Sequence, residues 1–229
     1  MIRVHVICEG QTEEMFVQKL LAPWFTQREI FLTARLLGKS GHKGGKVCRE
    51  RLFKDARLLL LEDSSSYCTT LIDYYGMKSD VPGKIEADQL PTPAAKAACL
   101  IAAISASLQE ELGERQATAM RRFIPYVQLH EFEALLFSDP KGLTKGIYQD
   151  HLVDDFITIR KGFDTPENIN NSIHTAPGKR IEALFPLYEK PNDSISAALE
   201  IGLEAMRREC ALFRGWMDRL AGLQPLKGV

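Results

Sequence analysis

Short apolar runs that contain β-branched residues alternate with stretches of helical spacing through the first part of the chain. The apolar runs predict strands over four ranges: 2–8, 30–37, 67–73 and 122–130. Between them, apolar residues spaced three and four positions apart predict helices over three ranges: 12–25, 47–62 and 94–112. Strands that alternate with helices are typical of a largely parallel sheet with helices on both faces. The pattern therefore predicts an α/β fold.

The pattern changes after Ser138-Asp139-Pro140. No strand is expected beyond this point, and helices are predicted over four ranges: 150–162, 177–188, 192–206 and 207–221. We therefore expect an α/β domain over residues 1–140 and a helical C-terminal region over residues 141–229 that packs on it.

Acidic residues stand at the ends of three predicted strands. Glu9 follows the first strand and precedes Gly10, Asp73 closes the third, and Glu131 and Glu133 follow the fourth. The carboxyl ends of parallel strands meet at one edge of the sheet, so we expect these side chains to lie close together. Crowded carboxylates repel one another unless a cation neutralises them. The expected ion is Mg²⁺, or Mn²⁺ in its place, because such ions take oxygen ligands and keep positions for water and phosphate.

Each acid also has a purely structural interpretation. Glu13 and Glu14 stand in the first turn of a helix that Thr12 would cap, where carboxylates complement the helix dipole. Asp73 could cap the turn that follows it, and one glutamate of the later pair could point to solvent. His130 is interpreted as a hydrogen-bonded structural residue rather than a metal ligand.

Basic residues are concentrated between Arg35 and Arg57. Eight Lys or Arg residues stand there against Glu50 and Asp55, a local balance of +6 in a chain whose formal net charge is −1. Lysines beside flexible glycines can contact a phosphate backbone without demanding a base sequence, whereas the structural alternative is a solvated loop and helix face. Nucleic-acid binding, to DNA or RNA, is assigned to Lys39, Lys43, Lys46, Arg49 and, later in the chain, Arg180.

The glycine-rich segment 38–46 does not form an ATP-binding phosphate loop. Its end resembles G-x-x-x-x-G-K-[ST], but Val47 follows Lys46 where a serine or threonine is required. ATP hydrolysis by this segment is therefore excluded.

Lys179 and Arg180 follow Pro177 at the start of a predicted helix. Cations at this end of a helix oppose its dipole, so we interpret Lys179 as a catalytic residue that holds substrate phosphate near the acids. The alternative is an ion pair with Glu167 or Glu182.

The composition argues against several classes of protein. With 45% hydrophobic and 26% charged residues, the chain is typical of globular rather than disordered proteins. Its five cysteines include no C-x-x-C pair, so neither a disulfide framework nor a zinc site is expected. No stretch approaches the ~20 apolar residues that span a bilayer, and the first residues lack the apolar core of a signal peptide. We therefore expect a cytoplasmic protein without membrane contact. Whether it is a homo-oligomer is left open.

Several segments together resemble the bacterial family called domain of unknown function 4276. They run in order along nearly the whole chain: Glu9-Gly10-Gln11-Thr12-Glu13, Leu71 to Gly76, Val127 to Phe137, Pro166 to Asn170 and Ala176 to Arg180. The family resembles a branch of the Toprim fold, the metal-binding module of topoisomerases, primases and overcoming-lysogenization-defect nucleases. The resemblance implies a Toprim-like sheet with Glu9 as its first-strand glutamate and Asp73 as the first acid of a D-x-D pair.

The sequence departs from the Toprim pattern at Tyr75, which stands where the second aspartate of that pair should be. Glu131 and Glu133 are expected to compensate. The leading hypothesis is a Mg²⁺-dependent nuclease, and the resemblance implies a role in phage defence beside an ATPase partner of the ABC or structural-maintenance type. One alternative is a catalytically inactive Toprim-like module that binds or regulates such an ATPase. Another is a nucleotidyl or phosphoryl transferase.

Overall fold

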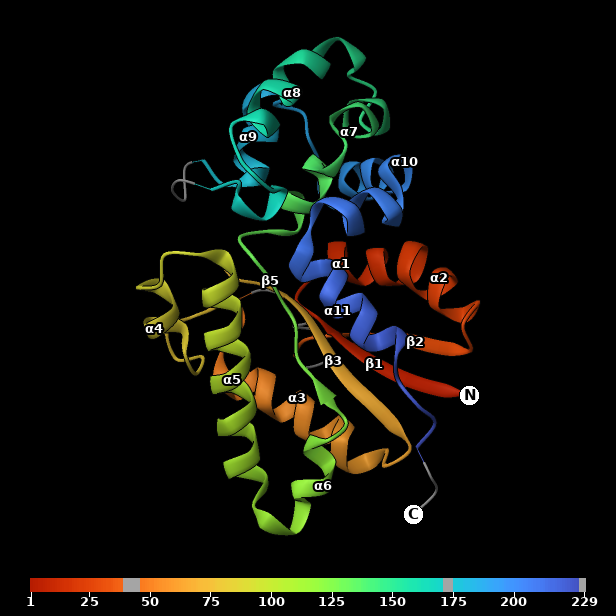
Figure 1. Cartoon of the computed structure of the whole chain (residues 1–229), viewed down its shortest axis with the longest axis vertical. Coiled ribbons are helices and arrows are strands. Elements are labelled where there is room, and N and C mark those ends of the chain that lie inside the picture. Colours follow the sequence, from red (N-terminus) through yellow and green to blue (C-terminus); the bar gives the residue numbers. More distant parts are fainter. Residues whose placement is uncertain (39–45, 171–174, 227–229) are drawn as a thin grey trace.

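The chain forms a parallel sheet with helices on both faces (Figure 1). The computed structural model describes residues 1–38, 46–170 and 175–226. The strands are β1 (Ile2–Cys8), β2 (Ile30–Leu36), β3 (Ser66–Asp73), β4 (Phe123–Ile124) and β5 (Val127–Gln128). Their order is β2-β1-β3-β4, and β5 also pairs with β3. All of these pairings are parallel, which agrees with the predicted α/β class and mainly parallel sheet.

Alternate side chains of the central strands enter two hydrophobic clusters, one on each face of the sheet. Val4, Val6 and Cys8 of β1 pack with apolar residues of the first helices and of the C-terminal helices. Ile7 enters the other cluster, with residues of α3 (Arg49–Glu62) and α5 (Pro93–Leu112). Because both faces are covered, β3 is buried almost throughout its length, as expected for a central parallel strand.

The first predicted helix has an interruption. It consists of α1 (Gln11–Phe16), a π-helical turn η1 (Val17–Leu21) and α2 (Ala22–Thr26). Pro23 has no N–H to donate to the carbonyl four residues earlier, and the wide turn lies just before it.

The predicted strand over residues 122–130 is shorter than expected and divided. Pro125 lies between β4 and β5 and cannot donate a ladder hydrogen bond. The Thr70 hydroxyl of β3 bridges the gap: it donates to the Tyr126 carbonyl at 2.6 Å and accepts from the Tyr126 N–H at 2.9 Å. After β5 the chain turns through His130, whose φ is 67°, into the 3-10 helix η3 (Phe132–Ser138).

Several short elements lie in segments that were predicted as loops or lacked a prediction. Those before residue 140 are α4 (Lys84–Asp88), η2 (Glu114–Gln116) and α6 (Ala117–Met120).

The elements in the described part of the chain after Asp139 are all helical. They are α7 (Pro140–Gly146), η4 (Asp150–Leu152), α8 (Val153–Lys161), η5 (Pro166–Asn168), α9 (Pro177–Leu184), α10 (Asn192–Glu209) and α11 (Ala211–Ala221). The predicted helical character of the C-terminal region therefore holds.

Helix α11 returns to the sheet and lies across the face that also carries α1 and α2 (Figure 1). The Trp216 indole N–H donates to the Thr69 hydroxyl at 2.8 Å, and its ring stacks on Tyr126 with centroids 4.6 Å apart. One hydrophobic cluster thus contains residues from both sides of position 140, while the division into two domains there stays a prediction. Within the described residues, no helix has the length and apolar character needed to cross a bilayer.

Candidate acidic site

Glu9 and Asp73 meet at the carboxyl edge of the sheet, because β1 and β3 are adjacent parallel strands. The Glu9 carboxylate accepts the backbone N–H of Asp73 at 3.0 Å. It also lies directly against Gly76, where a Cβ atom would stand 1.9 Å from Glu9 Oε1. The close approach explains a glycine at position 76: any larger residue would displace the carboxylate.

The Asp73 carboxylate connects β3 to the segment after β5. Its Oδ2 accepts the Phe132 N–H at 3.1 Å. Its Oδ1 is buried and has no hydrogen-bond partner among the described residues. A buried carboxylate oxygen without a donor is costly unless it is protonated or faces a cation.

Glu131 and Glu133 join the same region from the start of η3. Glu131 Oε2 accepts the Gly178 N–H of α9 at 2.9 Å. Glu133 is 1% exposed and pairs with Lys190 Nζ at 2.7 Å. Its other oxygen accepts the Ser194 hydroxyl at 3.1 Å. The C-terminal helices therefore reach the acids through both glutamates, and neither carboxylate points freely into solvent.

Glu13 is a further member of this group. As predicted it stands in the first turn of α1, where it accepts the Gly10 N–H at 2.8 Å in a capping box. It is also buried, with 5% exposure, and its charge acts on both Glu9 and Asp73. Helix capping and membership of the acidic site are thus combined in one side chain.

The carboxyl groups disfavour one another's ionisation. Burial, followed by the charges of neighbouring acids, raises the pKa of Glu9 to about 7. The pKa of Glu13 is also raised to about 7, first by burial and then by the charge of Glu133. Burial and the charges of Glu13, Glu9 and Glu133 raise the pKa of Asp73, and burial raises that of Glu131. Ionising all of these acids together is therefore unfavourable unless a cation neutralises them.

Lys190 is the basic residue that contacts the acids. Burial alone would lower its pKa, but the charge and hydrogen bond of Glu133 outweigh burial and raise it. Glu131 and Asp73 act in the same direction. A Cβ at Gly178 would lie 3.1 Å from Lys190 Nζ and 2.9 Å from Glu131 Oε2, so the close packing of α9 also depends on a glycine.

The donor set fits a hard divalent cation in its chemistry. Glu9, Asp73, Glu131 and Glu133 supply carboxylate oxygens, and Asp73 Oδ1 lacks a partner. The side chains are nevertheless turned toward backbone N–H groups and Lys190. Within the described part of the chain, no three His, Cys, Asp or Glu side chains are grouped closely enough to hold an ion as they stand. A cation would therefore have to draw carboxylates away from their present partners.

Lys179 and Arg180 have other partners. Lys179 forms an ion pair with Glu182 of the same helix, one of the two alternatives that the sequence left open. Arg180 donates from Nε to the Thr175 carbonyl at 2.8 Å and lies over the Phe163 ring. Their roles at phosphate stay predictions. No contact described here joins either side chain to Glu9 or Asp73.

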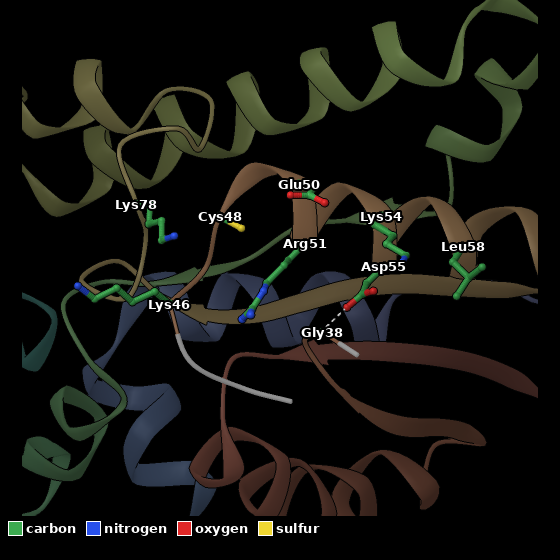
Figure 2. Close-up of a pocket in the computed structure, with 9 residues that line it drawn as sticks. All are labelled: Gly38, Lys46, Cys48, Glu50, Arg51, Lys54, Asp55, Leu58 and Lys78. Atoms are coloured by element: carbon green, nitrogen blue, oxygen red, sulfur yellow. Dashed lines mark hydrogen bonds between the residues drawn. The ribbon is translucent and has the colours of Figure 1, made fainter. Parts of the chain in front are cut away.

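The structure describes only part of the predicted nucleic-acid residues of the basic segment. Lys39 and Lys43 lie outside the described residues. Arg49 pairs with Glu111 at 3.1 Å and lies over the Phe53 ring. Lys46 lines a pocket of about 850 Å³ together with residues of α3 (Figure 2).

Tyr75 and His130 stand beside the acids rather than among them. Their ring centroids are 5.5 Å apart. Burial raises the pKa of Tyr75 to about 12 and lowers that of His130 to about 4, so both are neutral at physiological pH. Tyr75 therefore supplies no anionic ligand at the second position of the D-x-D pattern.

Sequence reasoning identified the acids that end strands and missed two members of the site. Glu13 was assigned to capping alone, although the four-residue spacing from Glu9 across a tight turn could have indicated a shared location. Lys190 lies in the segment Tyr188-Glu189-Lys190-Pro191, where no motif marked it. Only the return of α9 and α10 toward the strand ends brings it to Glu133.

Comparisons with known proteins show a family and a solved structure that are similar to this chain. The C-terminal region of the OLD protein of Xanthomonas campestris pv. campestris is 13% identical, with 96% of this chain and 95% of that chain covered and a TM-score of 0.45. No curated protein matches. The profile of the family described as "Domain of unknown function (DUF4276)" matches residues 8–221, a range that contains all of the acids above. The chain therefore belongs to the DUF4276 family.

Proposed function

We propose that this protein is a Mg²⁺-dependent nuclease that hydrolyses phosphodiester bonds at the acidic site. The observation that carries the proposal is the convergence of Glu9, Asp73, Glu131 and Glu133, from separate strands and loops, at one edge of the sheet. Buried acids with raised pKa values, and one carboxylate oxygen without a partner, favour uptake of a divalent cation. Mn²⁺ would serve in its place.

Glu9 and Asp73 would hold the ion, with Glu131 or Glu133 completing the site and Glu13 adding negative charge. When bound, such an ion activates water and stabilises the leaving oxygen of a phosphodiester. Glu13 supports this role because its charge acts on both Glu9 and Asp73. It compensates for the missing acid at Tyr75.

Lys190 is better placed than Lys179 to contact substrate phosphate. Its ammonium group already lies among carboxylates, 2.7 Å from Glu133, and its side chain is 40% exposed. A cation that neutralises Glu133 would release this ammonium group, which could then hold a phosphate oxygen. Lys179 pairs with an exposed glutamate outside that contact.

The expected setting is phage defence beside an ATPase of the ABC or structural-maintenance type. This part of the proposal rests on the sequence resemblance to Toprim-like nucleases and on segment 38–46, which lacks the P-loop pattern needed to bind ATP itself.

The experiment compares Glu9→Gln, Asp73→Asn and wild type for cleavage of DNA and RNA with Mg²⁺ or Mn²⁺. Both substitutions should abolish cleavage while the metal-free melting temperature stays nearly constant or rises, because each removes a charge from a crowded site. Glu14→Gln, at the neighbouring position of α1, is the matched control and should retain cleavage. If both Glu9→Gln and Asp73→Asn cut as wild type does, the proposal is wrong.

An inactive binding module is the second candidate, favoured by Tyr75 and by carboxylates that are held by backbone N–H groups. It predicts a stable complex with an ATPase but no uptake of Mg²⁺ or Mn²⁺ in calorimetry. Micromolar binding of either ion that Asp73→Asn removes would contradict it.

A further inference from the structure

A basic pocket of about 850 Å³ lies between α3, Gly38 after β2 and Lys78 after β3 (Figure 2). Figure 2 shows Lys46 and Lys78 at one end, Arg51 in the middle and Lys54 toward the other end. Arg51 and Lys54 are three positions apart on α3 and so share a helix face. The cations therefore form a row across the pocket rather than a single point.

The charges in this pocket are poorly balanced. Its basic lining exceeds its acidic lining, which consists of Glu50 and Asp55. The Asp55 carboxylate is already engaged, since its Oδ2 accepts the Gly38 N–H at 2.8 Å. Among the described residues, no carboxylate forms an ion pair with Lys46, Lys54 or Lys78. Elsewhere many basic side chains are paired, as Arg49 is with Glu111. An excess of unpaired cations in a hollow favours an anionic ligand.

Both walls of the pocket are joined to the acidic site through short backbone connections. On one side, Leu37 next to Gly38 donates its N–H to the Cys8 carbonyl, one residue before Glu9. On the other, Val47 donates to the Gly76 carbonyl at 2.9 Å, and Gly76 is the residue that touches the Glu9 carboxylate. Lys78 follows Gly76 by two residues, which is at most about 7 Å along the chain. The basic pocket and the acidic site are therefore neighbours along the carboxyl edge of the sheet.

The lining selects for phosphates rather than bases. Apart from the charged side chains, the described lining residues are Gly38, Cys48 and Leu58, so the described part of the lining presents no aromatic ring for base stacking. Proteins that bind single-stranded nucleic acid through bases use such rings, whereas lysine and arginine contact the phosphate backbone regardless of sequence.

We propose that this basic pocket, formed by Lys46, Arg51, Lys54 and Lys78, binds the phosphate backbone of the nucleic-acid strand whose neighbouring phosphodiester reaches Glu9. The inference rests on the proposed nuclease function and adds residues to it, since Arg51, Lys54 and Lys78 were not predicted. It further specifies recognition that is independent of base sequence and sensitive to salt.

The test measures binding of fluorescent oligonucleotides of two unrelated sequences by anisotropy, in EDTA, at several salt concentrations. Lys54→Glu and Lys78→Glu should each weaken binding of both sequences on the order of tenfold, and Lys54→Ala and Lys78→Ala should lower the salt slope by about 0.7–0.9 per residue. Lys161→Glu, at an exposed position of α8, is the matched control and should bind as wild type does. Lys54→Arg keeps the charge and should restore most of the affinity. Circular dichroism shows whether each variant is folded.

The outcomes separate this inference from the nuclease proposal. Reduced binding by the pocket variants, together with wild-type protein that never cuts, would support the pocket and reject the nuclease. Cleavage by wild type that Lys54→Glu and Lys78→Glu leave unchanged, with unaltered affinity, would overturn the pocket and leave the nuclease standing. Affinity that depends strongly on base sequence, or an equal loss in Lys161→Glu, would also overturn it.

Discussion

The Glu9 carboxylate holds the backbone of Asp73 through a 3.0 Å hydrogen bond, so the two acids of neighbouring strands are fixed relative to each other. Glu9 is therefore both a charged group of the proposed site and a structural partner of β3. Asp73 likewise fixes the segment after β5, because its carboxylate accepts the Phe132 N–H. The position of each acid depends on the acid before it.

Gly76→Ala should disturb this arrangement more than a single methyl group suggests. The new Cβ would stand 1.9 Å from Glu9 Oε1, so the carboxylate would have to leave Asp73. We expect a loss of about 1–3 kcal/mol in the free energy of unfolding, measured with urea. The cost should be smaller when Glu9→Ala is also present. Gly215→Ala, where nothing lies within 4 Å of the added atom, should instead stabilise α11 by roughly 0.5–1 kcal/mol. Equal effects of the two substitutions would contradict the packing described for Glu9.

Metal-free protein should lose stability as pH rises from about 4.5 to about 7. Glu9 and Glu13 have a pKa of about 7 when folded, above the value of about 4.3 for an unfolded glutamate. The folded state therefore binds more protons in this window, and the free energy of unfolding falls as they are released. His5 and His130, whose pKa values are lowered, act in the opposite direction below about pH 6.5.

The measurement therefore compares the stability of wild type and Glu13→Gln. Thermal melting in EDTA from pH 5 to pH 8 gives the stability of each protein. Wild type should lose more stability across this range than the variant. Mg²⁺ should recover part of the loss at pH 8, because an ion that binds the ionised acids stabilises the folded state. Identical slopes for the two proteins would show that Glu13 does not titrate in the site.

Lys190→Met should destabilise the protein by leaving Glu133 buried without its counter-ion. A fully buried pair that loses one partner costs about 3–5 kcal/mol, and we expect about 2 kcal/mol here because the Lys190 side chain is 40% exposed. The double variant Lys190→Met, Glu133→Gln should recover much of the stability, since the amide needs no counter-ion. Chemical denaturation of wild type, Lys190→Met, Glu133→Gln and the double variant completes a double-mutant cycle. Additive losses would mean that the two side chains do not interact.

Trp216→Phe tests how firmly α11 is held against the sheet. The substitution keeps an aromatic ring near Tyr126 but removes the N–H that donates to Thr69 at 2.8 Å. Losing this buried hydrogen bond should cost about 1–2 kcal/mol. In a Thr69→Val background the same change should cost less, and an unchanged cost would show that the bond contributes nothing.

The sequence predicted the fold class well because β1, β2 and β3 follow simple local rules. Each is an apolar run with a clear end, and the parallel order follows from the helices between them. The fourth strand was harder. Its pairing depends on the Thr70 hydroxyl beyond Pro125, a contact between residues 56 positions apart that no local pattern reveals.

The candidate site divides in the same way. Glu9 and Asp73 could be identified because they end strands, and topology alone places strand ends together. Lys190 and the Gly178 N–H come from the helical region, whose approach to the sheet is set by tertiary packing. The roles of Lys179 and Arg180 were predicted from helix position alone. The pairing of Lys179 with Glu182 was one of two alternatives in the sequence, whereas the bond from Arg180 to the Thr175 carbonyl could not be read from helix position.

The hydrogen bonds that the carboxylates accept from backbone N–H groups have a consequence for the evolution of the family. Glu9 joins β1 to β3, Asp73 joins β3 to the segment after β5, and Glu131 joins that segment to α9. Selection for a stable fold would preserve a hydrogen-bond acceptor at these positions, either the acid or its amide, even in a descendant that had ceased to cut nucleic acid. Lys54 and Lys78 form no ion pair among the described residues, so no comparable structural role would preserve them. In a lineage that no longer binds its substrate, the basic row should be lost first and the acceptors at the acid positions last.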